Sequence, residues 1–280
     1  VLSFYLFMNL RSIIRYFHLN LALFLNLPFY HFGKHTHATK EKYLEIFNTA
    51  KNKKYPKVEE FLSKYNDKIE EDWINELALH TQVVIKPNPI NFQHGKIIYS
   101  ILMRHLKENQ QKEITILETG TARGFSSMVM AKALADTNTE GTIHTIDICP
   151  HDFKMMWNCI DDHEGMKTRA EILKPWEKYL SKINFIHGKS KNILKNLSLE
   201  KVNFAFLDAE HKLKDLKIEF EYVHKRQKKG DIIFFDDYTP KLFDEVVNFV
   251  DNIEKNYQYK VEKIQSSNLR GYAIATREED

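Results

Sequence analysis

Ile116-Leu-Glu-Thr-Gly-Thr-Ala-Arg-Gly124 joins an apolar run to an amphipathic segment, and it reveals more about the architecture than any other part of the chain. The run before the glycines is apolar at Ile114, Ile116 and Leu117. The segment after them has apolar side chains at helical spacing, namely Phe125, Met128, Val129 and Leu134. The order strand, small-residue turn and helix lets backbone approach a nucleotide-like ligand, because no Cβ blocks the approach.

Strands and helices alternate from residue 114 onward. Apolar runs predict strands at 142–146, 183–186, 202–207 and 231–235, and helical patterns lie between several of them. Near-continuous apolar strands of this kind predict a parallel sheet that is covered on both faces. Residues 259–265 and 271–276 have the pattern of a hairpin, which adds an antiparallel edge strand. The expected fold class is therefore α/β.

Acids and small polar residues stand at the ends of these predicted strands. They are Glu118, Asp147, Ser190, Asp208, Asp236 and Asp237. One such residue is commonly a helix cap or a turn residue. Several successive strands that end this way instead predict a ligand site, because ligands in open α/β sheets bind outside the carboxyl ends of the strands.

The individual positions indicate which chemical groups such a ligand would carry. Asp147 follows Gly120 by 27 residues, where a carboxylate can bridge two ribose hydroxyls and would repel a 2′-phosphate. Gly188 and Ser190 follow the third strand, where small groups can border an adenine. Glu118 either meets the ammonium of an amino-acid ligand, directly or through water, or caps the turn that follows it.

The ordered motifs resemble the class I S-adenosylmethionine (SAM)-dependent methyltransferases over residues 90–276. The matching segments are Glu118–Gly124, His144–Asp147, Leu207–His211 and Gly230–Tyr238, and the last two are most similar to small-molecule O-methyltransferases of the catechol, caffeoyl-CoA and macrolide-sugar types. The resemblance implies a Rossmann-like, doubly wound, seven-stranded sheet, mostly parallel, with an antiparallel C-terminal hairpin strand and an N-terminal helical extension. It implies SAM as cofactor, bound by Glu118, Gly120, Thr121, Ala122, Gly124, Asp147, Gly188, Ser190 and Asp208.

The resemblance also implies a metal and a base. Relatives often bind a divalent cation at the positions of Asp208, Asp236 and Asp237, and such an oxygen set suits Mg²⁺. The alternative is that the last two acids only cap the next helix. A catechol-type base corresponds to His211 and a sugar-type base to Glu210. His211 could equally cap or pack at the start of a helix.

Composition and the order of segments indicate the expected partners, compartment and domain boundaries. The 41 Lys+Arg against 38 Asp+Glu are interspersed, which indicates a solvated surface and no specific nucleic-acid partner. The two cysteines lack zinc or thioredoxin spacing, which fits a reducing, cytoplasmic compartment. We expect a hydrophobic segment at 1–33, a helical extension at 34–112 and a SAM-binding domain at 113–280. Residues 148–182 form an insertion in that domain, and a homo-oligomer is compatible with all of these features.

The N-terminal segment contains an uncharged run from Tyr16 to Tyr30. Its 15 residues fall short of the about 20 that a membrane span requires. We therefore expect a helix that packs on the domain or lies on a membrane surface, which would give peripheral membrane contact through residues 1–30.

The sequence thus predicts a SAM-dependent methyltransferase that acts on a hydroxyl of a small molecule or sugar, with a divalent metal as a further candidate component. One alternative is an NAD-type or nucleotide-sugar Rossmann oxidoreductase. Against it, the chain shows no separate catalytic Tyr-Lys pair, and the terminal hairpin favours the methyltransferase order. The other alternative is a protein that binds SAM without catalysing a reaction.

Overall fold

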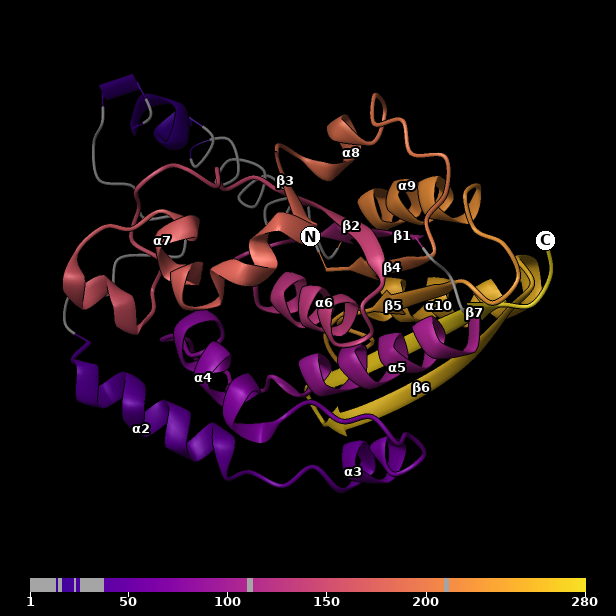
Figure 1. Ribbon diagram of the computed structural model, residues 1–280, viewed down its shortest axis with the longest axis horizontal. Helices are drawn as coiled ribbons and strands as arrows, with labels where there is room; N and C mark the ends of the chain where they lie inside the picture. Colours follow the sequence, from indigo (N-terminus) through magenta and orange to yellow (C-terminus); the bar gives the residue numbers. More distant parts are fainter. Residues whose placement is uncertain (1–13, 15–16, 23, 26–37, 110–112, 209–211) are drawn as a thin grey trace.

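The computed structural model describes residues 14, 17–22, 24–25, 38–109, 113–208 and 212–280, and a seven-stranded sheet lies at its centre (Figure 1). The strands are β1 (Glu113–Thr119), β2 (Glu140–Asp147), β3 (Ile183–His187), β4 (Phe204–Leu207), β5 (Ile232–Phe235), β6 (Tyr259–Ser267) and β7 (Arg270–Arg277). Their order across the sheet is β3-β2-β1-β4-β5-β7-β6. The first five are parallel, whereas β7 runs antiparallel to both β5 and β6. The predicted α/β fold and its closing hairpin are confirmed.

Helices flank this sheet on both sides. They are α2 (Lys40–Lys51), α3 (Pro56–Leu62), α4 (Glu71–Thr81), α5 (Gln93–Asn109), α6 (Phe125–Asp136), α7 (Arg169–Leu173), α8 (Ser190–Ile193), α9 (Leu213–His224) and α10 (Asp244–Asn256). Two 3₁₀ helices, η1 (Ile160–Glu164) and η2 (Lys174–Lys182), lie in the insertion between β2 and β3. Figure 1 shows α5 and α6 together in front of the sheet, with α8 and α9 above it in this view.

Two hydrophobic cores cover the two faces of the sheet, because successive side chains of a strand point to opposite faces. Phe204 and Phe206 of β4 belong to the core under α5 and α6, which also contains Ile116 and Phe125. The intervening Ala205 and the next residue, Leu207, belong to the core under α9 and α10. β4 is thus apolar on both sides, as is β5, and polar groups follow these two strands only at their ends.

The N-terminal extension packs directly on the first of these cores. Val58 of α3 and Leu77 of α4 are fully buried in the same cluster as Ile116 of β1. Gly95 lets α5 approach α6, since a Cβ at this position would lie 2.6 Å from the ring of Phe125. The extension therefore packs on the same side of the sheet as α5 and α6.

Part of the predicted hydrophobic segment is described, and it packs on the insertion. Leu19 and Ala22 are buried with Met155 and Trp157. Phe24 is 85% exposed on the same short helix. None of the described helices combines the length and the apolar character that a membrane span requires. Peripheral membrane contact stays a prediction.

A buried histidine in α5 gives the fold a pH dependence. His105 is 3% exposed, and burial lowers its pKa to about 4 from 6.5. As the pH falls from about 8 to about 5, His105 takes up a proton in the unfolded chain but not in the folded state. The free energy of unfolding therefore falls by about 2 kcal/mol because of this residue. Urea unfolding of the wild type and His105→Gln at both pH values measures this difference, and the variant should lose about 2 kcal/mol less. Equal losses in both proteins would contradict the assignment.

Candidate functional site

The glycine turn between β1 and α6 adopts the backbone that its composition predicts. Gly120, Ala122 and Gly124 have positive φ angles of 92°, 45° and 93°. The Gly120 amide donates to the carbonyl oxygen of Ile146 at 2.9 Å, which ties the turn to the end of β2. A Cβ on Gly124 would lie 2.8 Å from the side chain of Leu173, so glycine also allows α7 to approach. The turn is thus held between β2 and the insertion.

Asp147, the predicted ribose ligand, lies at the end of β2 beside this turn. Its Oδ2 accepts from the amide of Ala122 at 2.8 Å, and its Oδ1 accepts from the amide of Cys149 at 2.6 Å. The Arg169 guanidinium stands 3.6 Å from Oδ1. The carboxylate therefore joins the glycine turn to the start of the insertion, and 12% of its side chain remains exposed.

Arg169 is a buried residue of the insertion that the sequence did not single out. Its Nε donates to the carbonyl of Ala122 at 2.8 Å, and its Nη2 donates to the carbonyl of Cys149 at 3.0 Å. The guanidinium lies over the rings of Trp157 and Phe185. It thus stabilises the glycine turn from the side opposite β1.

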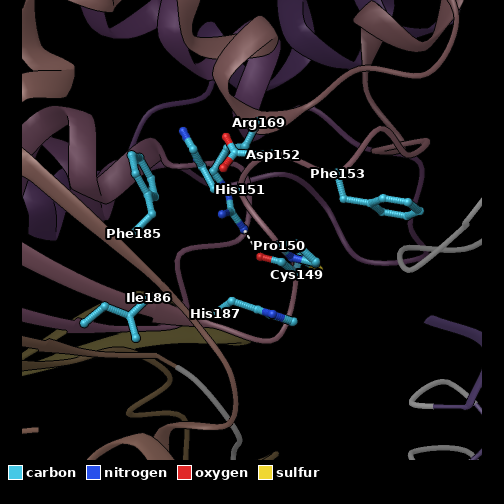
Figure 2. Close-up of a pocket in the computed structure, with 9 residues that line it drawn as sticks. All are labelled: Cys149, Pro150, His151, Asp152, Phe153, Arg169, Phe185, Ile186 and His187. Atoms are coloured by element: carbon cyan, nitrogen blue, oxygen red, sulfur yellow. Dashed lines mark hydrogen bonds between the residues drawn. The ribbon is translucent and has the colours of Figure 1, made fainter. Parts of the chain in front are cut away.

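A cavity of 350 Å³ opens beside Asp147, between the insertion and the end of β3. Its lining consists of Cys149, Pro150, His151, Asp152, Phe153, Arg169, Phe185, Ile186 and His187. Figure 2 shows the three β3 residues on one side of this group and the Cys149–Phe153 segment on the other. The His151 ring stacks on Phe185 with a centroid distance of 3.8 Å. The cavity adjoins the position that the sequence assigns to an adenine.

Gly188 and Ser190 follow β3 at the edge of this region. Gly188 has φ 149°, and its amide donates to the carbonyl of Asp147 at 2.8 Å. The Ser190 hydroxyl donates to Glu219 at 2.5 Å, and the Thr119 hydroxyl donates to the other oxygen of the same carboxylate at 3.0 Å. Glu219 was missed by the sequence analysis, although a signal existed: it is an acid on the apolar face of α9 beside Phe220.

Glu118 lies completely buried beneath the glycine turn. Its carboxylate accepts hydrogen bonds from the hydroxyls of Ser126 and Ser127 of α6 and of Thr145 of β2. Thr121 joins the same group, because its hydroxyl lies 2.5 Å from that of Thr145. Burial raises the pKa of Glu118, and the three hydroxyls oppose this shift. The structure thus gives this carboxylate three hydroxyl donors that link β1, α6 and β2.

The predicted metal ligands come together at the ends of β4 and β5. One oxygen each from Asp208, Asp236 and Asp237 lies within 4.8 Å of the others. Burial, and next the negative charge of Asp236, raise the pKa of Asp208 well above its usual range. Burial also raises the pKa of Asp236 to about 6, although the Arg270 guanidinium opposes this shift.

Arg270, at the start of β7, is paired with two of these acids. Its Nη1 donates to Asp237 Oδ1 at 2.9 Å, and its Nη2 donates to Asp236 Oδ2. Because Arg270 already pairs with one oxygen each of Asp236 and Asp237 and places a positive charge beside them, the group is a poor fit for Mg²⁺ as it stands. Arg270 falls between the two predicted hairpin strands, 259–265 and 271–276, where no pattern in the sequence indicates its pairing.

Two basic residues of the N-terminal extension complete the surroundings of the acids. His94 is 3% exposed, and its pKa is lowered well below the usual range by burial and next by the charge of Arg270. It stacks on Phe206 of β4, with a ring-centroid distance of 6.1 Å. Lys86 lies close enough to Arg270 and Asp237 for their charges to act on its amine. The two predicted bases, Glu210 and His211, lie outside the described residues.

Comparison with known proteins gives a family match for part of the chain and several matches to its fold. Residues 117–238, from the end of β1 to the loop after β5, match a protein family described as "Methyltransferase domain". No curated protein matches the chain. The structural matches below are all under 20% identical and therefore support the fold alone.

Three solved structures illustrate the likeness. Cofactor-bound Rv0187 from MTB is 15% identical with a TM-score of 0.55, and the match covers 82% of this chain and 100% of that one. The O-methyltransferase TomG from Streptomyces achromogenes, in complex with SAM, is 19% identical with a TM-score of 0.53 over 78% and 94% of the two chains. An O-methyltransferase from Bacillus cereus in complex with SAH is 15% identical with a TM-score of 0.50 over 86% and 100%. Residues 117–238 thus resemble a methyltransferase domain, and the chain shares its fold with solved O-methyltransferase structures.

Proposed function

We propose that this protein transfers the methyl group of SAM to a hydroxyl of a small molecule or sugar. The observation that carries the proposal is the polar group beside the glycine turn, which combines acids from the ends of β4 and β5 with Arg270 from β7. His94 and Lys86 add basic groups from the extension. Such a group can hydrogen-bond a hydroxyl acceptor, whereas an apolar pocket could not orient it.

The cofactor would lie along the carboxyl ends of β1, β2 and β3. The glycine turn offers its backbone to the methionine part, and Asp147 stands where the ribose hydroxyls are expected. The cavity lined by His151, Phe185 and Ile186 adjoins Asp147 and offers aromatic surface for an adenine. Arg169 fixes the turn and the insertion relative to each other, because it donates to the carbonyls of both Ala122 and Cys149.

SAM supplies a methyl group on a sulfonium, and the chain has to orient an oxygen in line with it. Positioning contributes much of the rate of such a displacement, because it replaces an encounter by a fixed geometry. Arg270 holds Asp236 through Oδ2, and Oδ1 of Asp236 has no hydrogen-bond partner among the described residues, so it has a defined direction for a hydroxyl donor. Either His211 or Glu210 stays the proposed acceptor of the hydroxyl proton, since both follow Asp208 directly after β4.

Calorimetry with SAM and with NAD tests the cofactor assignment. We expect the protein to bind SAM and its demethylated product with micromolar affinity and NAD at least about a hundredfold more weakly, a difference of about 2.7 kcal/mol. Binding of NAD but not SAM would favour the oxidoreductase alternative. A panel of phenols, sugars and hydroxy acids incubated with SAM should then yield one class whose mass rises by about 14 Da, the mass of a CH₂ group. SAM binding without any methylated product would instead support the non-catalytic alternative.

A further inference from the structure

We propose that Arg270 is the built-in cation of the acid group at the ends of β4 and β5, and that this methyltransferase works without a divalent metal ion. The inference deepens the proposed function, since it concerns the same acceptor site. Three carboxylates gathered at one sheet edge require positive charge nearby, because like charges at short range repel strongly in a partly buried site. In this chain, a side chain of β7 supplies that charge.

The contact has the forked geometry that arginine provides and a metal does not require. The two terminal nitrogens of Arg270 each donate to a different carboxylate, Asp237 at 2.9 Å and Asp236. Both acids are largely buried, with 12% and 1% of their side chains exposed. A planar guanidinium can bridge two neighbouring acids in this way, whereas a lysine ammonium acts as a single point charge.

The backbone of β7 holds the guanidinium in this position. A Cβ on Gly271 would lie 2.3 Å from the carbonyl oxygen of Tyr238, so glycine lets β7 run unusually close to the loop after β5. The Gly271 amide also donates to the Thr239 hydroxyl at 3.3 Å. The guanidinium itself lies 5.6 Å from the ring centroid of Tyr272. Arg270 is therefore part of a packed arrangement rather than a loose surface side chain.

A divalent ion would compete with this arrangement on two counts. It would have to share the two carboxylates to which Arg270 already donates, since Mg²⁺ and Mn²⁺ bind through oxygen ligands. It would also stand beside the guanidinium within a group whose oxygens lie inside 4.8 Å. Lys86 adds a further positive charge near Asp237. The positive charge of Arg270, which forms ion pairs with two of the three acids, thus disfavours a metal ion in this group.

Mn²⁺ binding to the full-length protein tests the inference without an acceptor or turnover. Titration followed by electron paramagnetic resonance compares the wild type with Arg270→Ala and Arg270→Lys. We expect no stoichiometric Mn²⁺ binding to the wild type or Arg270→Lys. Arg270→Ala should bind one Mn²⁺ at least about tenfold more tightly, because the guanidinium charge no longer opposes a cation beside the three acids. Arg104→Ala is the matched control, since it removes one arginine charge from the exposed face of α5, where Arg104 pairs with Glu108.

Two results would overturn the inference. The first is a wild-type protein that binds one Mn²⁺ and loses it in Asp236→Asn, which would show that the metal displaces the guanidinium. The second is a folded Arg270→Ala that binds Mn²⁺ no better than Arg104→Ala. If Arg270→Ala does not fold, the wild type and Asp236→Asn decide the question by themselves. Because none of these readouts uses SAM, a failure of the proposed methyl transfer would appear separately, in the calorimetry with SAM.

Discussion

Gly120→Arg is expected to reduce the affinity for SAM at least about a hundredfold, which corresponds to about 2.7 kcal/mol of binding free energy. Gly120 follows β1 directly and has φ 92°, a conformation that an L-residue adopts only at a cost of about 1–2 kcal/mol. The larger effect comes from the side chain, which would project from the turn where backbone has to approach the ligand. Calorimetry with SAM measures the loss, and thermal unfolding establishes that the variant is folded.

Gly165→Arg is the matched control for this prediction. Gly165 has nearly the same φ, 96°, but a Cβ there would meet no atom within 4 Å. Both substitutions therefore place an L-residue at positive φ, but Gly165 lies in the insertion and Gly120 in the turn between β1 and α6. The assignment of the turn to the cofactor would be refuted if the Gly120 and Gly165 variants bound SAM equally well.

The periodicity of the sequence was sufficient to predict most of the fold. All four residues of β4 and all four of β5 are apolar and buried, so neither strand has a polar face. This pattern indicates strands that are covered on both sides. The sequence also predicted the acid group, because parallel strands bring their carboxyl ends to one edge. Asp208 and Asp236 therefore lie together even though they are far apart along the chain.

The partners of these acids could not be predicted in the same way. Arg270 reaches Asp236 only because β7 pairs antiparallel with β5 and carries a glycine at the next position. The register of the hairpin depends on such local contacts and on the irregularity between Gln265 and Ser267 in β6. The alternation of apolar residues does not specify this register. Arg169 lies in a long insertion without a repeating pattern, so its contact with the glycine turn had no signal in the sequence.

Glu118→Ala is expected to lower the free energy of unfolding by about 3–5 kcal/mol, because it leaves three buried hydroxyls without their charged acceptor and opens a cavity. Glu118 is fully buried, and Ser126, Ser127 and Thr145 all donate to it. Urea unfolding measures the change. Glu113→Ala is the control on the same strand, where the side chain is exposed and a change within about 0.5 kcal/mol is expected.

Glu118→Gln separates this stabilising role from the predicted contact with the ammonium of the cofactor. The amide keeps the volume of the side chain and one oxygen that can accept from a hydroxyl, but its NH₂ group faces hydroxyls that were donors. If the carboxylate acts mainly on the fold, this variant loses stability while its affinity for SAM falls less than about tenfold, or 1.4 kcal/mol. If the carboxylate acts mainly on the ligand, the affinity for SAM falls at least about a hundredfold while the stability of the variant stays nearly unchanged. The three hydroxyl partners and the complete burial of Glu118 favour the first result, because the carboxylate already accepts three hydrogen bonds within the fold and has no exposed surface.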